Sequence, residues 1–315
     1  MNTDRRVREW YGPHTSRAAD WPLDALLLAK GTTTVSVVLP ARDEERTVGG
    51  IVSSIHRDLV HHAPLVEEII VVDSRSTDAT AAEAAREGAV VVRQDDVLAH
   101  LPPLSGKGEA LWKGLAASTG DLVVFVDADL RNFSTAFVTG LLGPLLLDPG
   151  TQFVKGAYER PLGRLRGEGG RVTELVARPL LNQWWPELSG FVQPLAGEYA
   201  ARREVLERVP FVTEYGVEFG LLVDLLDLVG LDAMAQVDLG CREHGHQSTA
   251  ALGRMAGQIM LTAWSRLERQ GRTIAAEPPG RTLLQFGPDR RAERCEVAVA
   301  ERPPLASLAI EEDVA

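Results

Sequence analysis

Asp127 and Asp129 are two carboxylates that directly follow an apolar stretch at residues 122–126. Five apolar, mostly β-branched residues in a row predict a strand that is buried on both faces. Residues i and i+2 of an extended chain point the same way, so both acids would face one cleft. Converging carboxylates suit a hard divalent cation such as Mg²⁺ or Mn²⁺, which can hold a diphosphate. The alternative is a polar strand end before a helix that Ser134 caps.

Acidic residues also follow two earlier apolar stretches. Asp43 and Glu44 come after a predicted strand at 35–39, and Asp73 ends another at 68–73. The carboxyl ends of parallel strands meet at one edge, where open α/β sheets bind ligands. We therefore expect the early acids to hold the base and ribose of a nucleotide, while the later pair binds the metal. Any one of these acids could instead be a solvated cap.

Lys107 stands between Gly106 and Gly108, at the start of a helix predicted to run to Ala117. Small glycines beside a lysine at a helix N-terminus are typical of an anion site. The spacing is not that of a P-loop. The alternative is a capped loop with a solvated lysine.

The elements that must position these residues alternate along the chain. Apolar stretches predict strands at 35–39, 68–73, 89–92 and 122–126, with helical spacing between them. Alternation of this kind indicates a parallel, doubly wound α/β sheet with helices on its faces. In the second half we predict strands at 152–158, 197–201 and 233–239, and helices at 217–229 and 249–270.

Composition excludes several classes of protein. The 315-residue chain has a net charge of −11 and a pI of about 5.2, which argues against a nucleic-acid binder. Its two cysteines, Cys241 and Cys295, give no disulfide framework or zinc signature, as in a reducing cytoplasm. No signal peptide is visible, and no uncharged apolar run reaches the roughly 18 residues of a membrane span. We therefore expect a cytoplasmic protein with no stable membrane insertion.

Four motifs in the first half occur in a specific order. They lie at residues 37–45, 70–80, 106–108 and 126–129. Together they resemble the nucleotide-sugar-dependent glycosyltransferases of the GT-A fold. That resemblance implies a Rossmann-like, mostly parallel sheet with an acceptor-binding region on its C-terminal side.

Motifs of the second half narrow the resemblance. Residues 169–174, 194–198, 215–218 and 242–244 are similar to the glucosyl-3-phosphoglycerate synthases, and the likeness then covers about 35–260. The family implies a retaining, metal-dependent transfer of glucose from UDP-glucose to the 2-hydroxyl of 3-phosphoglycerate, by a homodimeric enzyme that uses Mg²⁺ or Mn²⁺.

The resemblance also implies a role for each matching residue. Those expected at the donor are Pro40, Ala41, Glu44, Asp73, Ser74, Lys107, Asp127, Tyr215, Glu218 and Arg242. Those expected to act in catalysis are Lys107, Asp127, Leu195 and Glu218. Asp129 and His244 are expected to bind the metal. Gly170, Arg171 and Thr173 are expected to bind the acceptor phosphate, with His246 near the acceptor.

Two departures from the family pattern bear on specificity. Arg42-Asp43 replaces the usual Leu-Asn, beside the expected uracil site, and His246 replaces a frequent asparagine. The alternatives are a GDP-mannose-dependent mannosyl-3-phosphoglycerate synthase, a GT-A transferase with a lipid-phosphate acceptor, or a catalytically dead nucleotide-binding regulator.

No Pro/Ser-rich linker divides the chain, so we predict one composite globule. Residues 1–150 would form the nucleotide-sugar half, whose first 30 residues are an arm that packs on the main domain. Residues 151–287 would form the acceptor half. Residues 288–315 are charged and contain proline, which predicts a loose tail.

Overall fold

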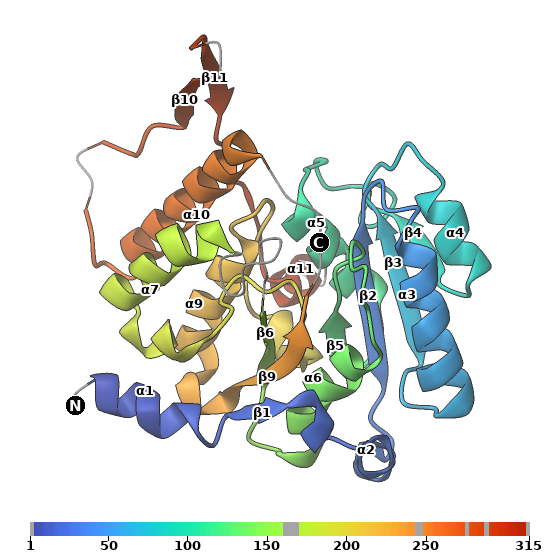
Figure 1. The fold of residues 1–315 in the computed structure, drawn as a ribbon. Helices are drawn as coiled ribbons and strands as arrows, with labels where there is room; N and C mark the ends of the chain where they lie inside the picture. The colour runs from blue at the N-terminus through green and yellow to red at the C-terminus, as the bar shows by residue number, and fades with distance from the viewer. Residues whose placement is uncertain (1–2, 160–169, 243–247, 275–276, 287–289, 313–315) are drawn as a thin grey trace.

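A single eight-stranded sheet forms the centre of the computed structural model, which describes residues 3–159, 170–242, 248–274, 277–286 and 290–312 (Figure 1). The strand order is β1-β9-β6-β7-β5-β2-β3-β4. Within this sheet β7 runs antiparallel to both of its neighbours, and the other pairs are parallel. The strands are β1 Thr15–Arg17, β2 Val35–Ala41, β3 Glu68–Asp73, β4 Val90–Arg93, β5 Leu122–Phe125, β6 Phe153–Glu159, β7 Tyr199–Arg202 and β9 Met234–Cys241.

Helices cover both faces of this sheet. They are α1 Thr3–Tyr11, α2 Leu23–Lys30, α3 Val48–Ile55 with its continuation η2 His56–His62, α4 Thr80–Arg86, α5 Lys107–Ala117, α6 Ala136–Leu147, η3 Thr173–Ala177, α7 Arg178–Trp184, α8 Arg203–Leu206, α9 Val217–Val229, α10 Thr249–Arg269 and α11 Leu305–Glu312. The predicted helices at 107–117, 217–229 and 249–270 are confirmed, the last ending one residue earlier.

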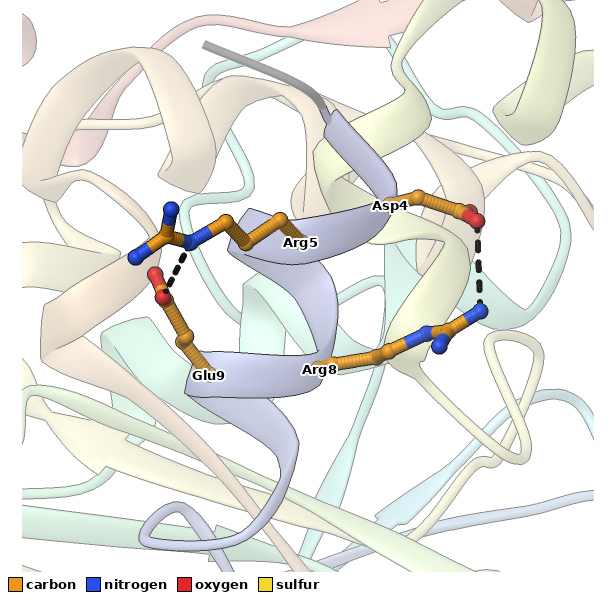
Figure 2. A pocket seen from close by; sticks show the side chains of 4 residues that line it. All are labelled: Asp4, Arg5, Arg8 and Glu9. Carbon is orange, nitrogen blue, oxygen red and sulfur yellow. Dashed lines mark hydrogen bonds and ion pairs between the residues drawn. The ribbon is translucent and has the colours of Figure 1, made fainter.

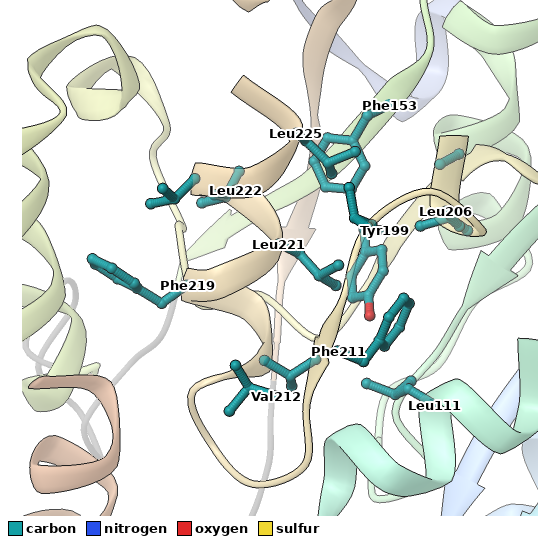
Figure 3. Close-up of a cluster of buried hydrophobic side chains, with 14 of the residues drawn as sticks. Leu111, Phe153, Tyr199, Leu206, Phe211, Val212, Phe219, Leu221, Leu222 and Leu225 are labelled. Atoms are coloured by element: carbon teal, nitrogen blue, oxygen red, sulfur yellow. The ribbon is translucent and has the colours of Figure 1, made fainter. Parts of the chain in front are cut away.

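Two hydrophobic layers flank the sheet because successive strand residues point to opposite faces. One layer packs α5, α7, α9 and α10 against the sheet, as Figure 3 shows for Leu111, Phe153, Tyr199 and Leu221. The other packs α2, α3 and α6 against the opposite face. In β2, for example, Val38 belongs to the first layer and its neighbours Val37 and Leu39 to the second. A sheet buried on both faces explains the nearly unbroken apolar strand sequences.

The N-terminal arm packs against the second half of the chain. Strand β1 pairs in parallel with β9, so Thr15 lies opposite Gln236. Trp10 is buried and donates a hydrogen bond from Nε1 to the Met234 carbonyl at 3.0 Å. Strands β5 and β7 are also paired, so both halves of the sequence contribute to one sheet.

The expectation of a loose tail at 288–315 is wrong for most of its described part. Strand β11 (Ala292–Glu296) pairs with β10 (Thr282–Phe286), and this hairpin stands away from the main globule in Figure 1. Strand β12 (Glu301–Arg302) pairs with β8 (Phe211–Val212), and α11 follows it. The composition is typical of a loose segment, but distant residues supply the partners that order it.

An open hollow on α1 is lined by Asp4, Arg5, Arg8 and Glu9 (Figure 2). Arg5 and Glu9 approach to 2.7 Å, and Arg8 and Asp4 to 3.4 Å, all on the exposed helix face. Exposed pairs four residues apart contribute about 0.3–0.5 kcal/mol each. They support α1 and indicate no ligand site. No described helix combines the length and apolar character needed to cross a membrane.

Candidate active site

Lys107 lies between two acids that come from distant parts of the chain. Its Nζ is 2.6 Å from Asp127 Oδ1 and 2.7 Å from Glu218 Oε1. Burial by itself lowers the pKa of Lys107, but the charges of Asp127 and Glu218 outweigh it and raise the pKa well above its ordinary value. The lysine is therefore a permanent cation, held where α5, the end of β5 and the start of α9 meet.

Gly197 sits against this ion pair from the turn before β7. A Cβ atom at this position would lie 2.3 Å from Asp127 Oδ2 and 2.4 Å from Lys107 Nζ. Any side chain would displace the pair, so only glycine permits this close approach of the backbone.

Arg242 is the second cation at the aspartates. It follows β9, and its Nη2 lies 2.5 Å from Asp127 Oδ2 and 3.1 Å from Asp129 Oδ1. Its Nε approaches Glu198 Oε1 at 3.2 Å. Asp127 thus lies between two cations, one on each carboxylate oxygen.

Glu198 is a site residue that sequence reasoning missed. It is fully buried beneath Arg242, directly before β7. Burial raises its pKa, and the neighbouring arginine opposes that rise. The sequence did contain a signal for Glu198, because it is an acid at the end of the motif at 194–198 and directly precedes an apolar stretch. An acid that is buried with such a stretch needs a charged or hydrogen-bonding partner.

The carboxyl ends of β2, β3 and β5 converge as predicted. The loop after β2 contacts the loop after β5, because Thr47 Oγ1 donates to the Ala128 carbonyl at 2.6 Å. Burial, followed by the charge of Asp129 and then that of Asp127, raises the pKa of Glu44 in the first of these loops to about 7. Ala41 is in register with Asp73, and Ser74 N–H donates to the Ala41 carbonyl at 2.8 Å.

Of the other residues predicted at the donor, Pro40 and Ser74 were expected at the uracil and ribose and lie on this edge, while Tyr215 was expected at the glucose and lies just before α9. Pro40 is half-buried in β2, and the Ser74 hydroxyl donates to Gln94 Oε1 at 2.7 Å. Tyr215 exposes 41% of its surface one turn before Glu218, which is almost wholly buried. Tyr215 is thus accessible to solvent beside a closed ionic centre.

Asp43, part of the departure from the family pattern, joins two loops of this edge. Its backbone φ is +56°, its N–H donates to Ser76 Oγ at 3.0 Å, and its Oδ1 accepts from Thr77 N–H at 2.7 Å. Aspartate tolerates this left-handed conformation better than most residues. The residue therefore ties the loop after β2 to the loop after β3.

Lys155 is a second group that the sequence did not indicate. It is 1% exposed in β6, and its Nζ has no hydrogen-bond partner among the described residues. The ammonium lies 4.8 Å from the centre of the Tyr199 ring on the neighbouring strand. Burial lowers its pKa to about 7, with Glu218 opposing that change and Lys107 adding to it.

The residues predicted at the acceptor lie on another segment. Gly170 has a φ of +78° and precedes Arg171, where helical structure begins. Thr173 is buried, and its Oγ1 has no hydrogen-bond partner among the described residues. Leu195 is half-buried in the turn before β7 and packs on the core. His244 and His246 lie outside the described residues.

The donor set fits a hard divalent cation. Asp127 and Asp129 present oxygens to one guanidinium nitrogen, so a cationic atom already stands between the two carboxylates. Within the described ranges no three His, Cys, Asp or Glu side chains are grouped as a metal site, and the predicted partner His244 falls in a gap between those ranges. The two carboxylates therefore fit such a cation, and His244 stays a prediction.

Comparison with known proteins places this geometry in a family. Residues 36–170 match the family model of glycosyl transferase family 2. Glucosyl-3-phosphoglycerate synthase of Mycolicibacterium smegmatis is 46% identical over an alignment of 306 residues, which covers 95% of this chain and 98% of that protein. The enzyme of the same name from Petrotoga mobilis is 43% identical over 90% of this chain and 89% of its own length.

Solved structures agree with the sequence relatives. Glucosyl-3-phosphoglycerate synthase from Mycobacterium tuberculosis, in complex with Mn²⁺, UDP-glucose and phosphoglyceric acid, is 45% identical with a TM-score of 0.81, covering 91% of this chain and 95% of that one. Mannosyl-3-phosphoglycerate synthase from Rubrobacter xylanophilus is 41% identical with a TM-score of 0.90, covering 96% and 99%. These matches confirm the predicted GT-A fold. The chain therefore belongs to the glucosyl-3-phosphoglycerate synthase family of glycosyltransferases.

Proposed function

We propose that this enzyme transfers glucose from UDP-glucose to the 2-hydroxyl of 3-phosphoglycerate with retention of the anomeric configuration. The observation that carries the proposal is the Asp127 carboxylate, bridged by Lys107 on one oxygen and Arg242 on the other. Two cations beside the C-terminal end of β5, the half-buried Lys107 and the buried Arg242, suit the diphosphate of a nucleotide sugar. The names and bound ligands of the relatives supply the sugar and the acceptor.

Lys107 and Arg242 stabilise the charge that develops on the leaving diphosphate. Both are held by acids before substrate arrives, so little reorganisation is needed in the transition state. Glu218, buried at the start of α9, holds Lys107 and faces the glucose in our assignment. Leu195 presents its backbone beside the reacting carbon, and Tyr215 contacts the sugar from the rim.

No carboxylate of this centre is assigned as a covalent nucleophile, because Asp127 and Glu218 both engage Lys107. We assign attack on the same face as departure, with the acceptor hydroxyl passing its proton to the departing phosphate oxygen. The C–O bond to UDP breaks and the new glycosidic bond forms on one face of the sugar, so the configuration is retained.

A divalent cation, Mg²⁺ or Mn²⁺, belongs to this proposal. Asp129 and His244 would hold it, and when bound it neutralises part of the diphosphate charge. Pro40, Ala41, Glu44, Asp73 and Ser74 would hold the uracil and ribose.

The acceptor phosphate would bind at the start of the η3 helix. Gly170 permits close approach of backbone N–H groups, Arg171 offers a two-pronged hydrogen bond, and the Thr173 hydroxyl has no other described partner. His246 would lie near the acceptor carboxylate.

Steady-state kinetics of matched lysine variants tests the proposal. Lys107→Met is expected to lower kcat by about a hundredfold or more, the scale of losing one preorganised charge. Lys30→Met is the control, because Lys30 lies at the C-terminal end of α2 and pairs with Glu67 instead of Asp127. Wild-type turnover in Lys107→Met would refute the assignment.

The mannosyl alternative is the second candidate, since the Rubrobacter xylanophilus neighbour carries that name. Comparing kcat/KM for UDP-glucose, GDP-mannose and ADP-glucose with 3-phosphoglycerate separates the two. We expect UDP-glucose to be preferred, because the 45% identical glucosyl-3-phosphoglycerate synthase from Mycobacterium tuberculosis binds UDP-glucose. A higher value for GDP-mannose would establish the alternative.

We also propose a cytoplasmic location and a homodimer. The location is supported by Cys241 and Cys295, which are both free thiols in the structure. Cell fractionation tests the location, and light scattering coupled to size-exclusion chromatography tests the dimer.

A further inference from the structure

The first turn of α5 forms ion pairs on two opposite sides of the helix. Lys107 and Glu109 are two residues apart on a helix, about 200° around its axis, so their side chains point in opposite directions. Lys107 reaches Asp127 and Glu218, and Glu109 is 1% exposed on the other side. The position of the lysine therefore depends on what holds the turn from behind.

Arg302 of the C-terminal strand β12 supplies that hold. Its Nε donates to Glu109 Oε2 and its Nη2 to Glu109 Oε1, both at 2.7 Å. The same Nη2 donates to the Pro102 carbonyl at 2.7 Å, in the segment that leads into α5. The guanidinium lies 5.2 Å from the Trp112 ring centre, and Trp112 Nε1 donates to the Pro303 carbonyl at 3.0 Å.

Backbone contacts make this attachment rigid. Glu109 N–H donates to the Thr213 carbonyl at 3.1 Å, and Thr213 N–H donates to the Ala300 carbonyl at 3.0 Å. A Cβ atom on Gly108 would lie 1.7 Å from the Val212 carbonyl oxygen, so α5 starts directly against β8. The first turn of α5 thus packs against strands β8 and β12, and Arg302 binds Glu109 of that turn.

The ion pair between Arg302 and Glu109 contributes little net stability to the attachment of the C-terminal segment. Arg302 is 5% exposed and Glu109 1%, and desolvation of both charges offsets much of their attraction. A planar guanidinium fork on a carboxylate fixes orientation as well as distance, which an apolar contact does not. Fixing the orientation of the turn is what the neighbouring Lys107 requires.

We propose that Arg302 is a positioning residue: through Glu109 it fixes the first turn of α5 and thereby holds the Lys107 ammonium between Asp127 and Glu218. The inference rests on the proposed role of Lys107 in turnover. It gives the C-terminal segment a function in catalysis, although none of its described residues contacts the ionic centre around Asp127.

A double-mutant cycle measured by single-turnover kinetics tests the inference. Arg302→Gln is expected to lower kcat about tenfold to a hundredfold, since misplacement of a catalytic group by about 1 Å costs on that order. Arg302→Lys, which keeps the charge without the fork, should recover part of the loss. In a Lys107→Met background, Arg302→Gln should lower the remaining rate by less than about threefold.

Arg269→Gln is the matched control. Arg269 also contacts β12, with its Nη2 2.5 Å from Glu301 Oε2, but it lies half-exposed on α10 and does not contact α5. We expect its rate to stay within about twofold of wild type. Comparable losses in Arg269→Gln and Arg302→Gln would show a general effect of disturbing the tail and overturn the inference.

The outcomes also separate this inference from the proposed function. If Arg302→Gln lowers the rate by the same factor with Lys107 and with methionine at that position, Arg302 does not act through Lys107. The role of Lys107 would then still stand. If Lys107→Met alone keeps wild-type turnover, both the proposed role and the positioning inference fall. Should Arg302→Gln not fold, the same cycle with Arg302→Lys decides the question.

Discussion

Replacing Lys155 with methionine should stabilise the protein, and more so at neutral than at alkaline pH. The amine is buried with no hydrogen-bond partner among the described residues, and its pKa falls from the ordinary 10.5 to about 7. A lysine whose pKa is lower in the folded than in the unfolded chain destabilises the fold, and this penalty has its full size at pH values below the pKa of the folded chain. The penalty disappears as pH rises through the unfolded value.

The size of the effect follows from these two pKa values. At about 1.4 kcal/mol per pKa unit, the lowered pKa of Lys155 reduces the free energy of unfolding by about 4 kcal/mol at pH 7 and by about 2 kcal/mol at pH 9. Methionine has a similar length and no charge, so it fills the space beside Tyr199 without this cost. The gain in the free energy of unfolding should therefore shrink by about 2 kcal/mol between the two pH values.

Urea unfolding followed by tryptophan fluorescence, at pH 7 and pH 9, measures both quantities. Lys30→Met is the control, because Lys30 contacts Glu67 at 2.5 Å near the surface and should matter by about 1 kcal/mol or less. A Lys155→Met variant that is no more stable than wild type at pH 7 would refute the reasoning. A gain that does not change with pH would refute the titration argument specifically.

Three further predictions concern the site. Arg242→Ala should lower kcat by about a hundredfold or more, because Asp127 loses one of its two cations, and Arg242→Lys should recover part of it in the same assay. Chelation should abolish turnover, Mg²⁺ or Mn²⁺ should restore it, and Asp129→Ala should not respond to either ion; full activity of that variant at saturating donor would contradict the metal assignment. Arg171→Ala should raise the KM for 3-phosphoglycerate by about thirtyfold, equivalent to about 2 kcal/mol, with that for UDP-glucose unchanged; the opposite pattern would move Arg171 to the donor.

The sequence predicted the elements whose signals are local. Apolar stretches ended in acids at Asp73 and Asp127, and the structure places both at the carboxyl edge of the sheet. Lys107 at the start of a helix between two glycines was likewise predicted, because capping and turn chemistry are properties of adjacent residues. The resemblance added Glu218 and Arg242, which the structure brings to the same aspartate.

Pairings between distant residues, and with them Glu198, Glu109 and Arg302, were missed. Glu198 and Arg242 are 44 positions apart, and Glu109 and Arg302 are 193 apart. No periodicity connects such residues, since their pairing depends on how strands β7, β9 and β12 are placed in space. The charged, proline-containing tail was predicted to be loose for the same reason. Glu109, the buried acid that pairs with Arg302 of the tail, lies in a distant part of the sequence.

In the proposed reaction, the centre around Asp127 transfers glucose from UDP-glucose to 3-phosphoglycerate with retention. Proton NMR of one reaction containing UDP-glucose, GDP-mannose, 3-phosphoglycerate and Mg²⁺ tests it most directly, because each donor and product has its own anomeric signal. We predict that the UDP-glucose signal disappears while an α-glucoside signal grows and GDP-mannose persists. Consumption of GDP-mannose in preference to UDP-glucose, or a β-linked product, would rule out the proposed reaction.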